Sequence, residues 1–250
     1  MQFYNVDSVY LILIIAASGP VIGSLIGVLK KPSDFFVYNM LAFAAGVMLT
    51  ISFLNLIPES IELSSIWLCC IGIITGSLLM YVLDRLIPHI HPSFCIPERS
   101  RNLQRTAVYL LLGIFMHNFP EGMAIATGTV TNFNVTLSIA IAIAIHNIPE
   151  GICTSAPYYY LTKNKLKTFL ISSSTAIPLI IGFIIAFILF KNISYEIIGI
   201  IIAATAGLMI YISADELIPM AHSQGRKIWS HIPIFSLIIG VLFVIILGTI

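Results

Sequence analysis

The sequence has 250 residues, of which 58% are hydrophobic and 9% are charged, and its formal net charge is +1. Soluble domains carry roughly 25% charged residues, so this composition excludes an ordinary soluble fold, and the balanced charge excludes a strongly basic nucleic-acid-binding protein. The four cysteines show no CxxC spacing and do not predict a disulfide framework. The composition indicates an all-α polytopic membrane protein.

Eight apolar segments follow one another along the chain, and each is long enough to cross the hydrocarbon of a bilayer, which takes about 20 residues. We expect each to be helical, because a backbone exposed to lipid must satisfy its hydrogen bonds internally. No basic residue precedes the first segment, so we interpret it as a span and not as a signal peptide. The predicted spans are residues 8–29, 35–57, 66–87, 106–130, 134–161, 168–190, 195–219 and 232–250.

The basic residues test this count of spans. Eleven of the twelve Lys and Arg residues lie in or beside the loops after spans one, three, five and seven, and the other loops contain only Lys191. The positive-inside rule assigns the Lys- and Arg-rich side to the cytoplasm. The sequence therefore predicts an integral protein of the cell membrane with both termini outside.

The chain also repeats itself. Residues 46–58 align without a gap with residues 207–219, and seven of the thirteen positions are identical. Spans two and seven run in opposite directions in the predicted topology, which is typical of inverted-repeat transporters. We therefore expect one transmembrane domain over residues 1–250 in a 3+2+3 arrangement. Its parts are a first repeat at 1–90, a central metal-binding helix pair at 106–161 and a second repeat at 168–250.

Two hexapeptides of the pattern HNxPEG, at residues 117–122 and 146–151, lie inside the central pair of spans. On a helix, residues three and four positions apart share a face, so each hexapeptide presents its His, Asn and Glu together. A carboxylate at this depth costs about 2.5–3.5 kcal/mol on insertion scales, and a divalent cation held between the helices would offset both charges. The candidate ligands are His117, Asn118, Glu121, His146, Asn147 and Glu150.

With these hexapeptides the chain resembles the ZIP (Zrt-, Irt-like protein) transporters over nearly its whole length, and most of all their bacterial zinc-uptake branch. The resemblance implies eight helices in a 3+2+3 arrangement that move zinc, iron(II) or manganese into the cytoplasm. It assigns the six residues above to the transport site. It also matches the acidic pair Asp215-Glu216, which precedes Leu-Ile-Pro, to a metal site on the cytoplasmic exit path, with Glu216 as a ligand.

The sequence departs from the family pattern at two positions. Many relatives carry a Glu before the proline of span six, where this chain has Ile177. With two carboxylates in place of three, we expect one tightly held ion per protomer. Relatives commonly carry an acid near the outer mouth, where this chain has Asn55. We therefore expect entry of the ion to depend less on fixed charge at the outer mouth.

A secondary transporter of divalent transition-metal ions is the leading interpretation, with the metal as substrate and no cofactor. We do not expect an enzyme, although an intramembrane metal-dependent hydrolase using the same cluster is the alternative. Such an enzyme typically carries HExxH, which this chain lacks. The predicted partners are the metal ion and the lipid bilayer, without nucleic acid. The physiological metal, the coupling ion and the oligomeric state, for which a homodimer is one option, stay open.

Overall fold

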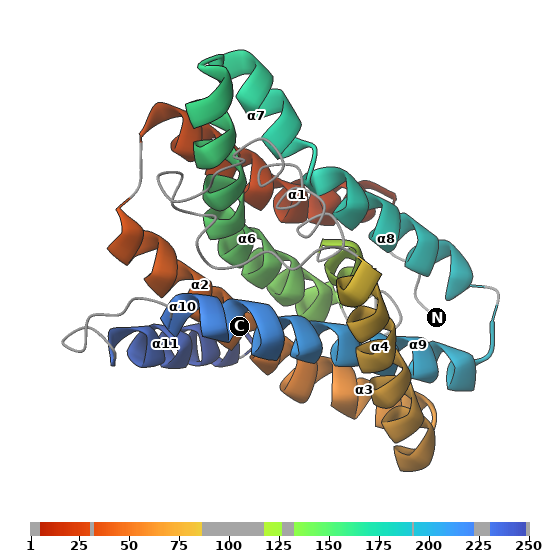
Figure 1. Cartoon of the computed structure of the whole chain (residues 1–250). Helices are drawn as coiled ribbons and strands as arrows, with labels where there is room; N and C mark the ends of the chain where they lie inside the picture. The colour runs from red at the N-terminus through yellow and green to blue at the C-terminus, as the bar shows by residue number, and fades with distance from the viewer. Residues whose placement is uncertain are drawn as a thin grey trace.

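The computed structural model describes residues 6–30, 33–86, 118–126, 133–191, 193–222 and 231–248. Within these ranges the secondary structure is helical, without a strand (Figure 1). One helical segment covers residues 118–126. The other helices are α1 (Val6–Leu29), α2 (Asp34–Ile51), η1 (Ser52–Leu56), α3 (Ile57–Leu63), α4 (Ile66–Leu86), α6 (Phe133–Thr162), α7 (Lys165–Ser173), α8 (Ala176–Leu189), α9 (Tyr195–Ile212), η5 (Ser213–Leu217), α10 (Ile218–His222) and α11 (Ile232–Leu247).

Six of the described helical stretches are long and apolar enough to cross a membrane. They are Tyr10–Leu29, Phe35–Leu63, Ile66–Arg85, Thr136–Ser155, Lys165–Leu189 and Tyr195–His222. Within the described residues they agree with the predicted all-helical membrane protein. Helix α11, with 16 residues, is apolar but shorter, and the span predicted over residues 106–130 is described only at 118–126.

Two predicted spans differ from the observed helices. The second was predicted to end at residue 57, just before Pro58, but helix α3 carries it on to Leu63. Pro58 sits in the first turn of α3, where a missing N–H costs no helical hydrogen bond. The sixth span was predicted as one helix, yet a turn at Ser174 and Thr175 divides it into α7 and α8.

Side-chain caps and one left-handed residue define helix ends at the turns. Ser33 caps α2 by accepting the N–H of Phe36 at 3.2 Å, and Asn164 caps α7 by accepting the N–H of Lys167 at 3.0 Å. Polar side chains at these positions satisfy N–H groups that have no partner within the helix. Helix α6 ends where Lys163 adopts φ 53°, which reverses the chain toward α7.

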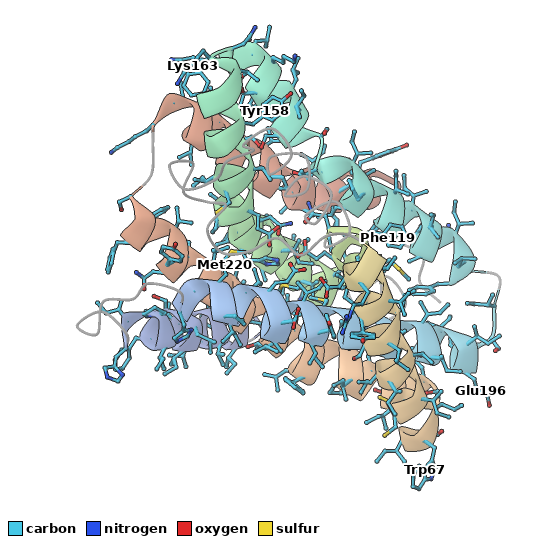
Figure 2. All side chains as sticks on the ribbon, in the orientation of Figure 1. Trp67, Phe119, Tyr158, Lys163, Glu196 and Met220 are labelled. Carbon is cyan, nitrogen blue, oxygen red and sulfur yellow. The ribbon has the colours of Figure 1, made fainter. Side chains whose placement is uncertain are left out.

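The helices pack as pairs that are distant in sequence. Helix α1 lies along α6, α4 along α9, and α11 along α2 (Figure 1). Figure 2 places Lys163 at one end of the molecule and Trp67 and Glu196 at the opposite end. The loop after span five and the turns that precede α4 and α9 therefore lie at opposite ends.

Two π-helices interrupt the second and seventh predicted spans at matching places. They begin at Ser52 and Ser213, which are aligned in the sequence repeat. The hydroxyl of Ser52 donates to the carbonyl of Met48 at 2.9 Å, and that of Ser213 donates to the carbonyl of Met209 at 2.8 Å. π-Turns are frequent at functional positions. The two aligned segments thus share a local distortion as well as residues.

Glycines set the close approach of these helix pairs. A Cβ atom at Gly46 of α2 would meet the carbonyl of Leu237 in α11, and one at Gly207 of α9 would meet the carbonyl of Ile73 in α4. Gly46 and Gly207 are aligned in the repeat. Small residues let helix backbones approach in a bilayer, where lipid is as apolar as the side chains. Each of the two aligned segments therefore packs against its partner helix through a glycine.

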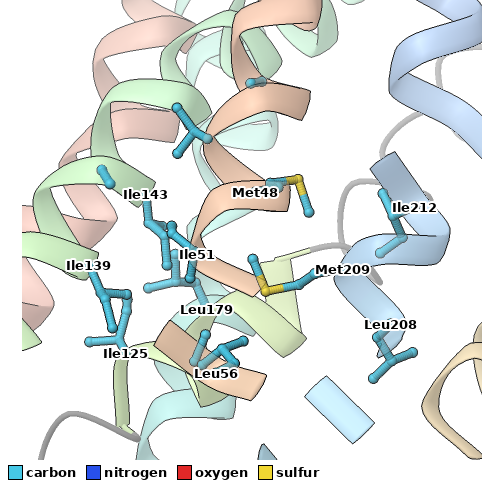
Figure 3. Packing of buried hydrophobic residues seen from close by; sticks show 14 of the residues in the cluster. Met48, Ile51, Leu56, Ile125, Ile139, Ile143, Leu179, Leu208, Met209 and Ile212 are labelled. Atoms are coloured by element: carbon cyan, nitrogen blue, oxygen red, sulfur yellow. The ribbon is translucent and has the colours of Figure 1, made fainter. Parts of the chain in front are cut away.

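The apolar core lies where α2, α6, α8 and α9 meet. Figure 3 shows Met48 and Ile51 of α2, Ile143 of α6, Leu179 of α8 and Met209 of α9 in this region, and all five are fully buried. Many other Ile, Leu and Phe side chains of α1, α4, α8 and α11 are exposed on the outer surface. Such a surface suits hydrocarbon and would be unfavourable in water.

Candidate metal site

The two hexapeptides meet in the interior of the protein. The segment 118–126 carries Glu121, and helix α6 carries His146 and Glu150. One ligand atom from each of these three residues lies within 4.8 Å of the others. Their exposed fractions are 0% for Glu121, 0% for His146 and 3% for Glu150. The pair of carboxylates predicted to face each other is therefore close enough to share one ion.

Glu121 is bound by two side chains of the facing helix. Its Oε1 lies 2.7 Å from Nε2 of His146, and its Oε2 accepts a hydrogen bond from Nδ2 of Asn147 at 2.7 Å. Both contacts join the segment 118–126 to α6 across the site. A buried carboxylate is costly without such partners. The second hexapeptide therefore stabilises the charge of the first.

The surroundings of His146 fix where its hydrogens lie. Its Nδ1 is 3.0 Å from the carbonyl oxygen of Ala142, which can only accept, so Nδ1 carries a hydrogen. The 2.7 Å contact between Nε2 and Glu121 then needs a further hydrogen on one of its two atoms. An ion that takes both atoms as ligands must displace that hydrogen.

Two amide oxygens in the site have no hydrogen-bond partner. Asn118 donates from Nδ2 to the carbonyl of Thr175 at 2.6 Å, and Asn147 donates to Glu121. The Oδ1 atoms of Asn118 and Asn147 are buried and accept no hydrogen bond. An unsatisfied buried oxygen costs about 1–3 kcal/mol. Such atoms fit a site built for a cation.

These groups suit a divalent transition-metal ion. One imidazole nitrogen, two carboxylates and two amide oxygens form a borderline-hard ligand set, which favours zinc, iron(II), manganese or cobalt. Thiolates would favour copper(I), and among the described cysteines Cys153 is buried in α6 but is not part of the cluster. The geometry therefore agrees with the ligand chemistry expected from the sequence.

Both hexapeptides are held by an outer helix in the same way. A Cβ atom at Gly122 would meet the carbonyl of Leu179 in α8, and one at Gly151 would lie 2.5 Å from the carbonyl of Pro20 in α1. In return, a Cβ at Gly182 of α8 would meet the carbonyl of Phe119. Likewise, a Cβ at Gly23 of α1 would meet the carbonyl of Ile148 in α6. The packing role of the two hexapeptide glycines was not predicted, although a glycine follows the Glu in both hexapeptides.

Two predicted ligands, His117 and Glu216, are not among the described residues of this cluster. His117 falls outside the described residues. Glu216 is in η5, apart from the central cluster, and is half-buried beside the exposed Asp215. Asp84 of α4 and this pair are near enough to Tyr211 for their charges to act on its hydroxyl. Ile177, the departure in span six, has a 48% exposed side chain.

Comparison with known proteins identifies the family. Residues 97–248 match the family model described as "ZIP Zinc transporter". The chain is 36% identical over 223 residues to "Zinc transporter ZupT" of Salmonella arizonae, and 35% identical to proteins of the same name from Salmonella paratyphi A and Salmonella newport. Each match covers 86% of this chain and 87% of the relative. These relatives are transporters and not hydrolases, in agreement with the expectation that the chain is not an enzyme. The chain belongs to the ZIP zinc transporter family and is an integral membrane protein.

Proposed function

We propose that this protein carries zinc, and by the same ligand chemistry iron(II) or manganese, across the cell membrane into the cytoplasm. The ion binds between the fourth and fifth spans. Its proposed ligands are those predicted from the two hexapeptides, namely His117, Asn118, Glu121, His146, Asn147 and Glu150. The observation that carries the proposal is the buried cluster of Glu121, His146 and Glu150, whose ligand atoms lie within 4.8 Å of one another.

We extend the proposal to the architecture of eight spans in a 3+2+3 arrangement with inverted repeats. The matching π-helices support it, as do the matching glycine contacts of Gly46 and Gly207. The glycines of the two hexapeptides add support, because Gly122 and Gly151 meet an outer helix in equivalent ways. In such transporters the substrate lies near the midplane between the repeats.

Uptake into proteoliposomes tests the proposed function. Vesicles containing the purified protein should accumulate zinc, and parallel assays with manganese, iron(II) and cobalt rank the ions. The matched control is protein with Glu121→Gln and Glu150→Gln, which keeps side-chain size and removes charge. Zinc uptake equal to that of the control vesicles would exclude transport by this chain.

The proposed topology places the termini and the loops after spans two, four and six outside. In a cysteine-free background, Ser64→Cys should react with an impermeant maleimide added to intact cells, and Lys165→Cys should react only after permeabilisation. Ser64 lies between α3 and α4, and Lys165 begins α7 on the Lys-rich side. Equal labelling of both positions in intact cells would contradict the topology.

We propose that Asp215 and Glu216 act in the release of the ion to the cytoplasm. Their repeat partners, Leu54 and Asn55, carry no charge, so a role on one side of the membrane follows. Glu216→Ala should slow zinc uptake severalfold and leave zinc affinity at the central site unchanged, as measured by uptake rates and equilibrium dialysis. Glu196→Ala, an exposed acid that begins the same span, is the control. Unchanged rates for Glu216→Ala would end this assignment.

A further inference from the structure

The sixth span is broken beside the candidate metal site. Helix α7 ends at Ser173 and α8 begins at Ala176. Pro178 has no N–H to donate to the carbonyl of Ser174, as a continuous α-helix would require. That carbonyl instead accepts the N–H of Ile177 at 3.0 Å, three residues on. The break is therefore a tight turn that Pro178 keeps from closing into an α-helix.

One residue of the break, Thr175, meets a candidate ligand. The carbonyl of Thr175 accepts Nδ2 of Asn118 at 2.6 Å, and both residues are almost fully buried. Because a carbonyl oxygen only accepts, the amide end that faces Thr175 must be the NH₂ group. The oxygen end of Asn118 therefore points the other way, and it has no hydrogen-bond partner.

The register between the two elements is fixed by backbone contacts. A Cβ at Gly122 would meet the carbonyl of Leu179, and a Cβ at Gly182 would meet the carbonyl of Phe119. The segment 118–126 is thus seated directly on α8, so a shift of the start of α8 would shift the partner of Asn118. The two asparagines differ in the acceptor of their side-chain NH₂ group. Asn118 donates to a backbone carbonyl of the sixth span, whereas Asn147 donates to Glu121, a member of the site itself.

We propose that Pro178 is a positioning residue for the metal site. By holding the break between α7 and α8, it presents the Thr175 carbonyl to Asn118 and turns Oδ1 of Asn118 toward the ion. This inference rests on the proposed function, in which Asn118 is an ion ligand. The anchor of Asn118 is independent of Glu121, so this amide oxygen keeps its orientation when Glu121 turns from His146 to an ion.

A double-mutant cycle tests the proposal. Pro178→Ala, Asn118→Ala and the double variant are purified in detergent, and zinc affinity is measured by equilibrium dialysis. Loss of a residue that orients a ligand commonly costs about 10–100-fold in metal affinity. We expect Pro178→Ala to weaken zinc binding about tenfold, and the double variant to bind no more weakly than Asn118→Ala alone. Pro233→Ala, the same change in the first turn of α11, is the control and should leave affinity unchanged.

A second variant tests the hydrogen bond to Thr175 without removing a proline or shortening a side chain. Asn118→Asp has nearly the same size but no NH₂ group, so it loses the hydrogen bond to Thr175 while offering a stronger ligand oxygen. We expect weaker zinc binding than in the wild type because the anchor is lost. Stronger binding by Asn118→Asp, unchanged affinity in Pro178→Ala, or additive effects in the double variant would each overturn the positioning role.

The proposed function fails by a different result. If zinc transport persists after both Glu121 and Glu150 are replaced, the central site itself is wrong. If those replacements abolish transport while Pro178→Ala binds zinc as the wild type does and Asn118→Ala binds it more weakly, only the positioning role is wrong.

Discussion

Replacing Glu121 or Glu150 by alanine is expected to lower zinc transport at least about a hundredfold, since even partners that only orient a ligand cost about 10–100-fold in affinity. Both carboxylates are buried, at 0% and 3% exposure, in helices that belong inside hydrocarbon. Removal of a buried charge does not hinder membrane insertion and can favour it. The variants should therefore insert and fold yet fail to transport.

A charge-neutral change separates binding from packing. Glu121→Gln retains an acceptor for Asn147 and a partner for His146, so it should remain as stable as the wild type while losing transport. The measurements are zinc uptake into proteoliposomes, thermal unfolding in detergent, and metal analysis of the purified wild type, where we expect one zinc per chain. Wild-type transport in the double alanine variant would refute the site.

Gly151→Ala is expected to be a strongly damaging small change outside the ligands. Its Cβ would lie 2.5 Å from the carbonyl of Pro20 and 2.8 Å from the N atom of Ser24, both backbone atoms of α1. Backbone cannot rotate aside as a side chain can, so α1 must move away from α6. Overpacking of this kind costs about 1–3 kcal/mol and occasionally more. Because Gly151 follows Glu150 directly, transport should fall together with stability.

The chain offers a matched control for this change. Gly248→Ala would bring a Cβ no nearer than 3.5 Å to the carbonyl of Val244, which is an ordinary contact. The amount of monodisperse protein after extraction and its unfolding temperature compare the two variants. Equal stability of Gly151→Ala and Gly248→Ala would contradict the packing of α1 against α6 described above.

The sequence predicted the helical membrane class and the central cluster because both depend on local patterns. Apolar runs specify helices in lipid, and the three- and four-residue spacing within each hexapeptide places Glu121, His146 and Glu150 on inward faces. The contact between Glu121 and His146 confirms that the hexapeptides face each other. The eight-span arrangement and the metal-binding role of these residues stay predictions.

What the sequence did not reveal depends on contacts between distant segments. Nothing local to Asn118 indicates that its amide would bind the carbonyl of Thr175, 57 residues away. The break between α7 and α8 was not predicted, because residues 168–190 were interpreted as one helix. The extension of the second span to Leu63 was not predicted either, and Pro58 is compatible with it because this proline lies in the first turn of α3.

The hydrogen bonds of Glu121 also bear on the part of a transport cycle in which nothing is carried. After releasing its cargo, a carrier must reset, and a bare carboxylate inside hydrocarbon would make that step slow. In this structure Asn147 and His146 close around Glu121 at 2.7 Å each. These contacts give the Glu121 carboxylate partners within the protein, so under the proposed function that charge is not left bare in the return step. An ion that takes Nε2 of His146 and Oε1 of Glu121 as ligands must first break the contact between them. Under the proposed function, the affinity for zinc is therefore a balance between two partners for one carboxylate oxygen.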